Sequence, residues 1–236
     1  VRIAHIKPGG AYISLKGGTL DPEHQTAPAA EIWTGSKLPW VTLLDAPAWE
    51  GQPPDMAPVM AAYAKARTQA AYDARAADYN ANYARSTPDG DLLAFMEAVC
   101  PGGRVLDLGC GPGNSAQMMA EAGFTAEASD VSAEMVRIAA ARPGVTARQE
   151  SFDQIDPTPR YDGIWANCSL LHSVKGEFPR HLRAVAAMLL PGGVLHLGMN
   201  LGTGEGLDAA GRHYANYSRD ELVAALHSVG LTVFAA

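Results

Sequence analysis

Apolar and polar positions follow two different patterns along this chain, and the pattern changes near residue 57. Before it, short apolar runs are separated by proline and glycine, which is typical of short β-strands. After it, the alanine-rich stretch from Val59 to Tyr83 contains neither glycine nor proline and predicts a helix, or two helices if the stretch breaks once. A shorter helix is expected from Asp91 to Val99.

From Arg104 onward, runs of strand length alternate with amphipathic stretches of helix length. We expect strands at 104–109, 124–129, 145–150, 161–166, 193–199 and 231–235, and helices at 114–122, 132–141, 177–190 and 218–229. Pro191-Gly-Gly193 is expected to be a turn between helix and strand, and Ser218 with Glu221 fits a capping box. The alternation predicts an α/β fold with a doubly wound, mostly parallel sheet and helices on both faces.

The first of these strands leads into three alternate glycines, in the run Val105-Leu-Asp-Leu-Gly-Cys-Gly-Pro-Gly113. Glycine permits backbone angles closed to other residues and leaves no Cβ to block a ligand, so a small cofactor can lie against bare backbone. A dinucleotide fingerprint would need glycine at position 114, where Asn114 stands. That the glycines merely link a strand to a helix remains an alternative.

Two acidic residues accompany the glycine turn. Asp107 stands two positions before Gly109, and Asp130 falls where the next parallel strand should end, a separation that suits a carboxylate binding a ribose diol. The pattern D-x-G-x-G-x-G resembles motif I of the class I S-adenosylmethionine-dependent methyltransferases. The resemblance to small-molecule members of that family covers residues 58–236, about three quarters of the chain.

The resemblance implies a Rossmann-like domain, S-adenosylmethionine as cofactor and a role for individual residues. The methionine portion would be held by Asp107, Gly109, Cys110, Gly111 and Gly113, and the ribose hydroxyls by Asp130. Around the adenine it places Val131, Met135, Phe152 and Asp153, with Asp153 accepting from the exocyclic amine. After the fourth strand, Asn167 would face the cofactor. Phe152 has ordinary core packing as its alternative.

Three further segments would surround the methyl acceptor. An amino-terminal lid, residues 58–100, carries Tyr72 and Tyr79, which either cover the cofactor or pack the helix. After the fourth strand, His172 either acts as a general base or only caps and packs. Arg212 could bind a carboxylate and Tyr214 could stack on a ring, unless their loop is simply solvated.

Composition and charge limit the classes of partner that this chain is expected to bind. The formal net charge is −7 and no block of lysine or arginine occurs, which disfavours nucleic acid. No apolar run reaches the roughly 18 residues of a membrane span, and the three separated cysteines suggest free thiols in a reducing cytoplasm. No metal site is expected. The competing functions are a cofactor-binding regulatory module, a nucleotide-dependent oxidoreductase and an RNA methyltransferase.

Because the pattern changes near residue 57, residues 1–57 are expected to form a separate amino-terminal segment. The closing antiparallel strand that the family places beside the sixth strand is missing after that expected strand. The segment 39–45 resembles the closing strand and could fill its place within the chain or, in a homodimer, between chains. A shortened chain and a small independent β appendage are the alternatives.

Overall fold

The computed structural model describes residues 4–6, 13–15, 48–50, 53–83 and 87–234, in two compact units, Val1–Tyr63 and Ala64–Ala236. In the first unit, β1 (Ala4–Ile6) pairs antiparallel with β2 (Ile13–Leu15). The expected closing strand at 39–45 lies outside the described residues, so its role stays a prediction. The expected domain boundary after residue 57 also stays a prediction.

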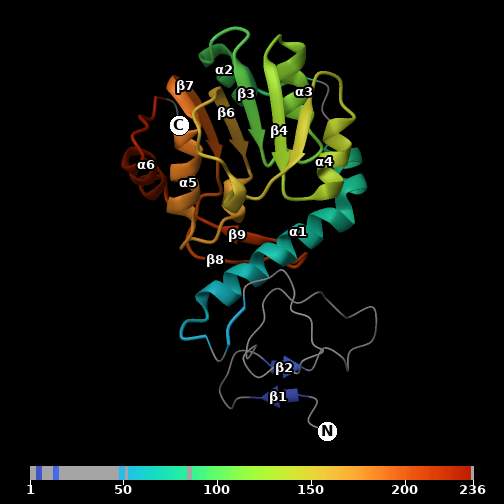
Figure 1. Ribbon diagram of the computed structural model, residues 1–236, viewed down its shortest axis with the longest axis vertical. Coiled ribbons are helices and arrows are strands. Elements are labelled where there is room, and N and C mark those ends of the chain that lie inside the picture. Colours follow the sequence, from blue (N-terminus) through green and yellow to red (C-terminus); the bar gives the residue numbers. More distant parts are fainter. Residues whose placement is uncertain (1–3, 7–12, 16–47, 51–52, 84–86, 235–236) are drawn as a thin grey trace. The chain divides into compact units, whose positions relative to one another are not determined.

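The second unit contains a five-stranded parallel sheet in the order β5-β4-β3-β6-β7 (Figure 1). Its strands are β3 (Arg104–Leu108), β4 (Thr125–Asp130), β5 (Thr146–Gln149), β6 (Tyr161–Asn167) and β7 (Leu189–Gly198). The chain builds outward from β3 in one direction and then returns to add β6 and β7 on the other side. Ligands of such sheets bind where the order reverses, outside the carboxyl ends of the central strands.

Six α-helices and an antiparallel hairpin accompany the sheet within the described residues. They are α1 (Ala57–Asn82), α2 (Gly90–Ala98), α3 (Asn114–Glu121), α4 (Ala133–Ala140), α5 (Phe178–Ala187), α6 (Arg219–Ser228), and the antiparallel pair β8 (Glu205–Leu207) and β9 (His213–Ala215). The expected capping box forms, since Ser218 Oγ accepts from Glu221 N at 3.2 Å. Among the described residues, no helix is long and apolar enough to cross a membrane.

Alternate residues of the central strands serve two separate cores. Leu106 and Ile164 pack with α5 and α6 on one face of the sheet, whereas Val105 and Trp165 pack with α2 and α3 on the other. Because both faces are covered, these strands are almost continuously buried. The predicted doubly wound α/β architecture is confirmed.

The region around Pro191 differs from the expectation. The helix ends at Ala187 instead of residue 190, and β7 begins at Leu189 because Leu189 pairs with Tyr161. The expected turn at 191–193 is therefore an irregularity within a strand, with Gly192 at φ +81°. A long-range strand pairing has overridden the local signal of proline and glycine.

The expected sixth strand at 231–235 is not formed by residues 231–234, which have no strand assignment. Residue 235 lies outside the described part of the chain. A strand exists only through hydrogen bonds to a neighbour, and within the described residues β7 pairs with β6 alone. Leu231 instead packs beside the core cluster under α6.

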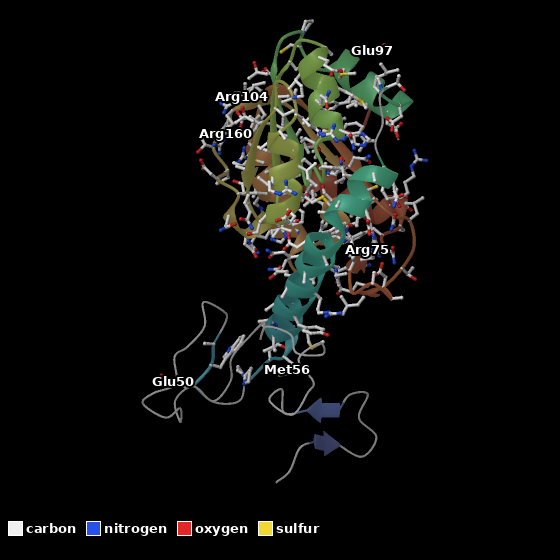
Figure 2. All side chains as sticks on the ribbon, turned by 90° about the vertical axis from the view of Figure 1, so that its right-hand side faces the viewer. Glu50, Met56, Arg75, Glu97, Arg104 and Arg160 are labelled. Atoms are coloured by element: carbon white, nitrogen blue, oxygen red, sulfur yellow. The ribbon has the colours of Figure 1, made fainter. Side chains whose placement is uncertain are left out.

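The two ends of the sheet differ in what covers them. Residues 64–82 of α1, together with β8 and β9, lie across the end toward which the strand arrows point (Figure 1). At the opposite end, Arg104 and Arg160 lie over the ring of Tyr161, at 5.2 and 5.8 Å from its centroid (Figure 2). The carboxyl ends of the strands are therefore the covered end, where a ligand site is expected.

Candidate functional site at the carboxyl ends of the strands

The glycine turn follows β3 directly and is left-handed at each glycine: φ is +72° at Gly109, +53° at Gly111 and +77° at Gly113. The amides of Gly109 and Cys110 both donate to the carbonyl of Ser129, at 2.7 and 2.9 Å. A Cβ atom on Gly109 would lie 2.3 Å from Cβ of Ser169, so this position has no room for a side chain. Ser169, buried after β6, was not predicted as part of the site.

Asp107 lies at the base of this turn and is 4% exposed. Its Oδ2 accepts from the amide of Ala116 at 3.1 Å, which ties the end of β3 to the first turn of α3. Burial raises the pKa of Asp107 to about 7, and the nearby charge of Asp130 adds to this. A cationic amino group placed beside Asp107 would favour the ionised carboxylate, whose hydrogen-bond donor within the described residues is the amide of Ala116.

The buried carboxyl group of Asp107 predicts a pH-dependent stability. The pKa of this group is about 7 in the folded chain and near 3.8 in the unfolded chain. Its contribution to the free energy of unfolding is therefore fully present below about pH 4 and is lost as the pH rises to 7, because ionising the buried group destabilises the folded chain. We expect the free energy of unfolding of the wild type to fall relative to Asp107→Asn over that range, by at most about 4 kcal/mol. Urea unfolding at pH 4.5, 6 and 8 measures it. Parallel curves for the two proteins would contradict the assignment, and Asp78→Asn on the exposed side of α1 is the control.

Asp130 ends β4 and faces the same turn. Its Oδ2 accepts from the amide of Gly111 and its Oδ1 from the amide of Ser132, both at 2.9 Å. Burial raises the pKa of Asp130 although both amide contacts lower it. The carboxylate is thus fixed in orientation between the glycine turn and the start of α4, where the resemblance places the ribose.

A pocket of about 380 Å³ lies at the carboxyl ends of β4 and β5, next to Val131, the residue that follows Asp130. Its lining consists of Gln69, Val131, Gln149, Ser151 and Gln154. Val131 and Met135 were both expected at the adenine. Val131 lines this pocket, whereas Met135 is 1% exposed, lies in the core and does not line it. The three glutamines were not predicted; their signal is weak, because only the fold brings residue 69 to the end of β5.

Asp153 was expected to accept from an adenine amine, but its oxygens have protein partners. Oδ2 lies 2.7 Å from Lys65 Nζ, while Oδ1 contacts His181 Nε2 at 2.9 Å and also Arg180. Its pKa is held far below the usual range, first by His181 and then by the two cations. Phe152 packs against the core cluster, as in its alternative reading. The adenine role of Asp153 stays a prediction that would require this ion cluster to open.

Helix α1 is tied over the turn by polar contacts. Asp73 Oδ1 accepts from Ser132 Oγ at 2.5 Å, and Asn80 Oδ1 accepts from Arg142 Nη2 at 2.9 Å. The Nε atom of Arg142 donates to the carbonyl of Pro112 inside the glycine turn. Asp73, Asn80 and Arg142 were missed in the sequence because their partners are 59 or 62 residues away, or 30 for the Pro112 contact. These contacts hold α1 where a lid would be.

Beyond the turn, aromatic rings form a cluster, called here the aromatic site: Tyr72, Tyr79, His172 and Tyr214, with Arg212 against two of them. The ring of His172 is 5.4 Å from Tyr72 and 4.8 Å from Tyr214, and Tyr79 is 5.9 Å from Tyr72, all between centroids. The guanidinium of Arg212 lies 5.8 and 5.3 Å from the rings of Tyr72 and Tyr214. The structure thus joins residues predicted separately from the lid, the fourth strand and the late loop.

The path to His172 begins with a strained turn. Asn167 is exposed at the end of β6, and Cys168 adopts φ +54°, a left-handed conformation that is unusual for a residue other than glycine. This bend directs the 3₁₀ turn Leu170–His172 back toward α1. Burial and the nearby cation of Arg212 outweigh a backbone contact and lower the pKa of His172 to about 4. At neutral pH the imidazole is therefore uncharged.

Arg212 was expected to bind a carboxylate with two hydrogen bonds, but part of its guanidinium is already used. Nε and Nη2 both donate to Asp208 Oδ2, at 2.9 and 2.7 Å. Within the described residues, Nη1 has no hydrogen-bond partner, which leaves the end of the guanidinium for a ligand. Asp208 was not predicted, although its spacing of four residues from Arg212 was a signal available in the sequence.

Comparison with known proteins agrees with this geometry. A family described as a methyltransferase domain matches residues 79–236. A trans-aconitate 2-methyltransferase of Methylobacterium nodulans is 35% identical over 121 residues, covering 49% of this chain and 45% of that protein, and one of Rhodococcus jostii is 41% identical over 88 residues, covering 36% and 34%. The chain thus spans about half or less of the length of these relatives.

Solved structures share the fold. A 1,6-didemethyltoxoflavin-N1-methyltransferase of Burkholderia thailandensis, solved with S-adenosylhomocysteine and 1,6-didemethyltoxoflavin, superposes with a TM-score of 0.58 at 20% identity, covering 71% of this chain and 78% of that one. The CcbJ methyltransferase of Streptomyces caelestis gives 0.58 at 19%, covering 72% and 89%. With the glycine turn, its two acids and the family match, the chain belongs to the class I S-adenosylmethionine-dependent methyltransferases.

Proposed function

We propose that this methyltransferase transfers the sulfonium methyl group to a small-molecule acceptor bound at the aromatic site. The observation that carries the proposal is the convergence of Tyr72, which lies on α1, with His172, Arg212 and Tyr214 next to the glycine turn. Such a cluster can hold a planar molecule by stacking and one anionic group by the free end of Arg212.

The residues of the chain fit the methyl donor. The glycine turn would hold its amino-acid portion with Asp107, Asp130 would accept from the ribose hydroxyls, and the glutamine-lined pocket would take the adenine. S-adenosylmethionine supplies an activated methyl group, so the chemistry is a direct displacement. The chain contributes alignment of acceptor and donor, which can lower the barrier by about 7–11 kcal/mol.

The contacts that hold α1 over the glycine turn support methyl transfer, because a displacement at the sulfonium proceeds best when water is excluded. Tyr72 and Tyr79 lie on the side of α1 that faces His172 and the turn, and a Cβ on Gly111 would lie 4.0 Å from Cε1 of Tyr79. Tyr79 also stacks on Tyr83 at 4.3 Å between centroids. We infer that this row of tyrosines closes the crevice over the donor and the acceptor.

A second candidate is methylation of a carboxylate. The relatives from Methylobacterium nodulans and Rhodococcus jostii are named for action on trans-aconitate, and the free Nη1 of Arg212 is suited to a carboxylate. A carboxylate is already deprotonated at neutral pH, so this reaction would need no base. Against it, Arg212 is already paired with Asp208, so the aromatic site offers little net positive charge to a tricarboxylate.

Two experiments test the proposal. Calorimetry measures the binding of S-adenosylhomocysteine, and the protein is then incubated with S-adenosylmethionine and a panel of phenols, amines and carboxylates that includes trans-aconitate. We expect micromolar binding and a methylated product detected by mass spectrometry. Arg212→Lys should reduce turnover of acidic acceptors more than binding of S-adenosylhomocysteine, because lysine lacks the planar guanidinium. Binding without any methylated product would favour the regulatory alternative.

A further inference from the structure

We propose that Tyr72 and His172 form a proton relay at the aromatic site, and that the acceptor is therefore a molecule which carries an O–H or N–H group at the atom that is methylated. This inference rests on the proposed function and names the class of its substrate. It excludes the carboxylate candidate, since a carboxylate has no proton to give at neutral pH.

The relay is defined by two hydrogen bonds of His172. Its Nδ1 lies 2.5 Å from the carbonyl oxygen of His213, and its Nε2 lies 2.8 Å from the hydroxyl of Tyr72. A carbonyl oxygen can only accept, so the hydrogen of the neutral imidazole is on Nδ1. The Nε2 atom then carries a lone pair, and the hydroxyl of Tyr72 is the donor.

The carbonyl that fixes this tautomer is itself held in place. His213 is 4% exposed, and its amide donates to Oγ1 of Thr68 at 2.8 Å. Thr68 Oγ1 in turn donates to the carbonyl of Ala64 at 2.8 Å, within α1. The lid helix and β9 thus together position the backbone of His213, and the tautomer of His172 depends on both.

The hydroxyl oxygen of Tyr72 becomes the acceptor end of the relay. With its hydrogen directed to His172, this oxygen keeps lone pairs for other donors, and the phenol of Tyr214 is its neighbouring hydrogen-bond partner, which an acceptor would replace. A ligand group that donates a hydrogen bond is attracted to such an oxygen, whereas the lone pairs of a carboxylate are repelled. The geometry therefore selects a hydroxyl or an amine.

The step balances in atoms and charge. The acceptor heteroatom forms a bond to the methyl carbon as the carbon–sulfur bond breaks, and sulfur keeps the electron pair. The proton of the acceptor passes to the oxygen of Tyr72, and the proton of Tyr72 passes to Nε2 of His172. The positive charge that leaves the sulfonium is replaced by an imidazolium, which later returns its proton to water when the site opens.

The groups that face His172 explain why its imidazole takes up the proton only when the methyl group is transferred. Tyr72 approaches it from α1, and Tyr214, Arg212 and His213 approach it from the hairpin, with Asp208 behind Arg212. Burial and Arg212 keep the imidazole neutral, and a sulfonium in the same crevice acts in the same direction. Its loss on transfer raises the proton affinity of His172 as the proton arrives.

Nitrogen-15 NMR of the histidine rings tests the relay without an acceptor. The chain has seven histidines, and His172→Gln identifies the signal of His172 by its loss. We expect an Nδ1–H tautomer, an Nε2 signal that shifts in Tyr72→Phe, and a higher pKa with S-adenosylhomocysteine bound than with S-adenosylmethionine. Tyr63→Phe, elsewhere on α1 and 41% exposed, is the control. An Nε2–H tautomer, or equal pKa values in the two complexes, would overturn the relay.

Turnover of two probes tests the acceptor class. 4-Hydroxyphenylacetate, which carries both a phenol and a carboxylate, and trans-aconitate are offered together with S-adenosylmethionine. The ether and the ester of 4-hydroxyphenylacetate have the same mass and are told apart by chromatography against standards of both compounds. The relay predicts ethers only, with kcat about 100-fold lower in Tyr72→Phe and in His172→Gln and little change in the KM for S-adenosylmethionine. Methyl esters, or no product from either probe, would overturn the relay. Failure of the wild type to bind S-adenosylhomocysteine would overturn both this inference and the proposed function.

Discussion

Gly109→Ala is expected to abolish detectable cofactor binding and to lower the free energy of unfolding by about 2–5 kcal/mol. Two causes add. The left-handed φ of +72° costs an L-residue about 1–2 kcal/mol, and the new Cβ would lie 2.3 Å from Cβ of Ser169. Relief of that contact must move either the turn or the segment after β6, and both border the donor site. Urea unfolding and calorimetry with S-adenosylhomocysteine measure the two effects.

Two further variants separate these causes. Gly102→Ala has the same backbone strain, with φ +73°, but nothing lies within 4 Å of its Cβ, so it should lose only the strain energy and bind the cofactor normally. Adding Ser169→Gly to Gly109→Ala leaves Cα of residue 169, at 3.5 Å, as the nearest remaining atom and should recover part of the stability. Equal losses for Gly102→Ala and Gly109→Ala would show that the close approach to Ser169 is unimportant.

Asp130→Ala is expected to weaken the binding of S-adenosylhomocysteine about 100-fold, which corresponds to about 3 kcal/mol. The change removes the carboxylate proposed for the ribose hydroxyls and leaves the amides of Gly111 and Ser132 without their 2.9 Å partner. The glycine turn then loses one of the contacts that hold its shape. Calorimetry at fixed pH and salt gives the change in affinity directly.

The matched variants for this position are Asp130→Asn and Asp78→Ala. Asparagine keeps one oxygen acceptor and the shape of the side chain, so its loss of affinity should be intermediate. Asp78 is exposed on α1, and its removal should leave cofactor affinity unchanged. A dissociation constant for Asp130→Ala within twofold of the wild type would exclude this carboxylate from the site.

The parts of the fold that the sequence predicts well are those set by local chemistry. The three glycines at 109, 111 and 113 permit the left-handed backbone that this turn adopts, and Ser218 with Glu221 caps α6 through neighbours three residues apart. Alternating strands and helices likewise gave the layers of the sheet. These features need no knowledge of distant partners.

The misses have the opposite origin, because they depend on partners far away in the chain. Leu189 joins β7 through Tyr161, which overrides the turn signal of Pro191. The ion pairs of Asp153, whose adenine role stays a prediction, also went unforeseen, because Lys65 lies 88 residues earlier in the sequence and Arg180 lies on another helix. No local pattern reveals such pairs.

The aromatic site shows both kinds of inference. Tyr72, His172, Arg212 and Tyr214 were each selected from a local pattern, yet the hydrogen bond between Tyr72 and His172 joins residues 100 positions apart. Its consequence, a phenol oxygen that accepts and a histidine that does not face the acceptor itself, follows only from the folded arrangement. The sequence therefore named the residues, and the fold is needed to define their roles.

A crystal structure of the chain with S-adenosylhomocysteine bound tests the central claim most directly. The account predicts the amino-acid portion of the ligand against the backbone of residues 109–113, its ribose hydroxyls within hydrogen-bond distance of Asp130, and its sulfur directed toward the aromatic site. Ligand density at another location, or a ribose without contact to Asp130, would contradict it.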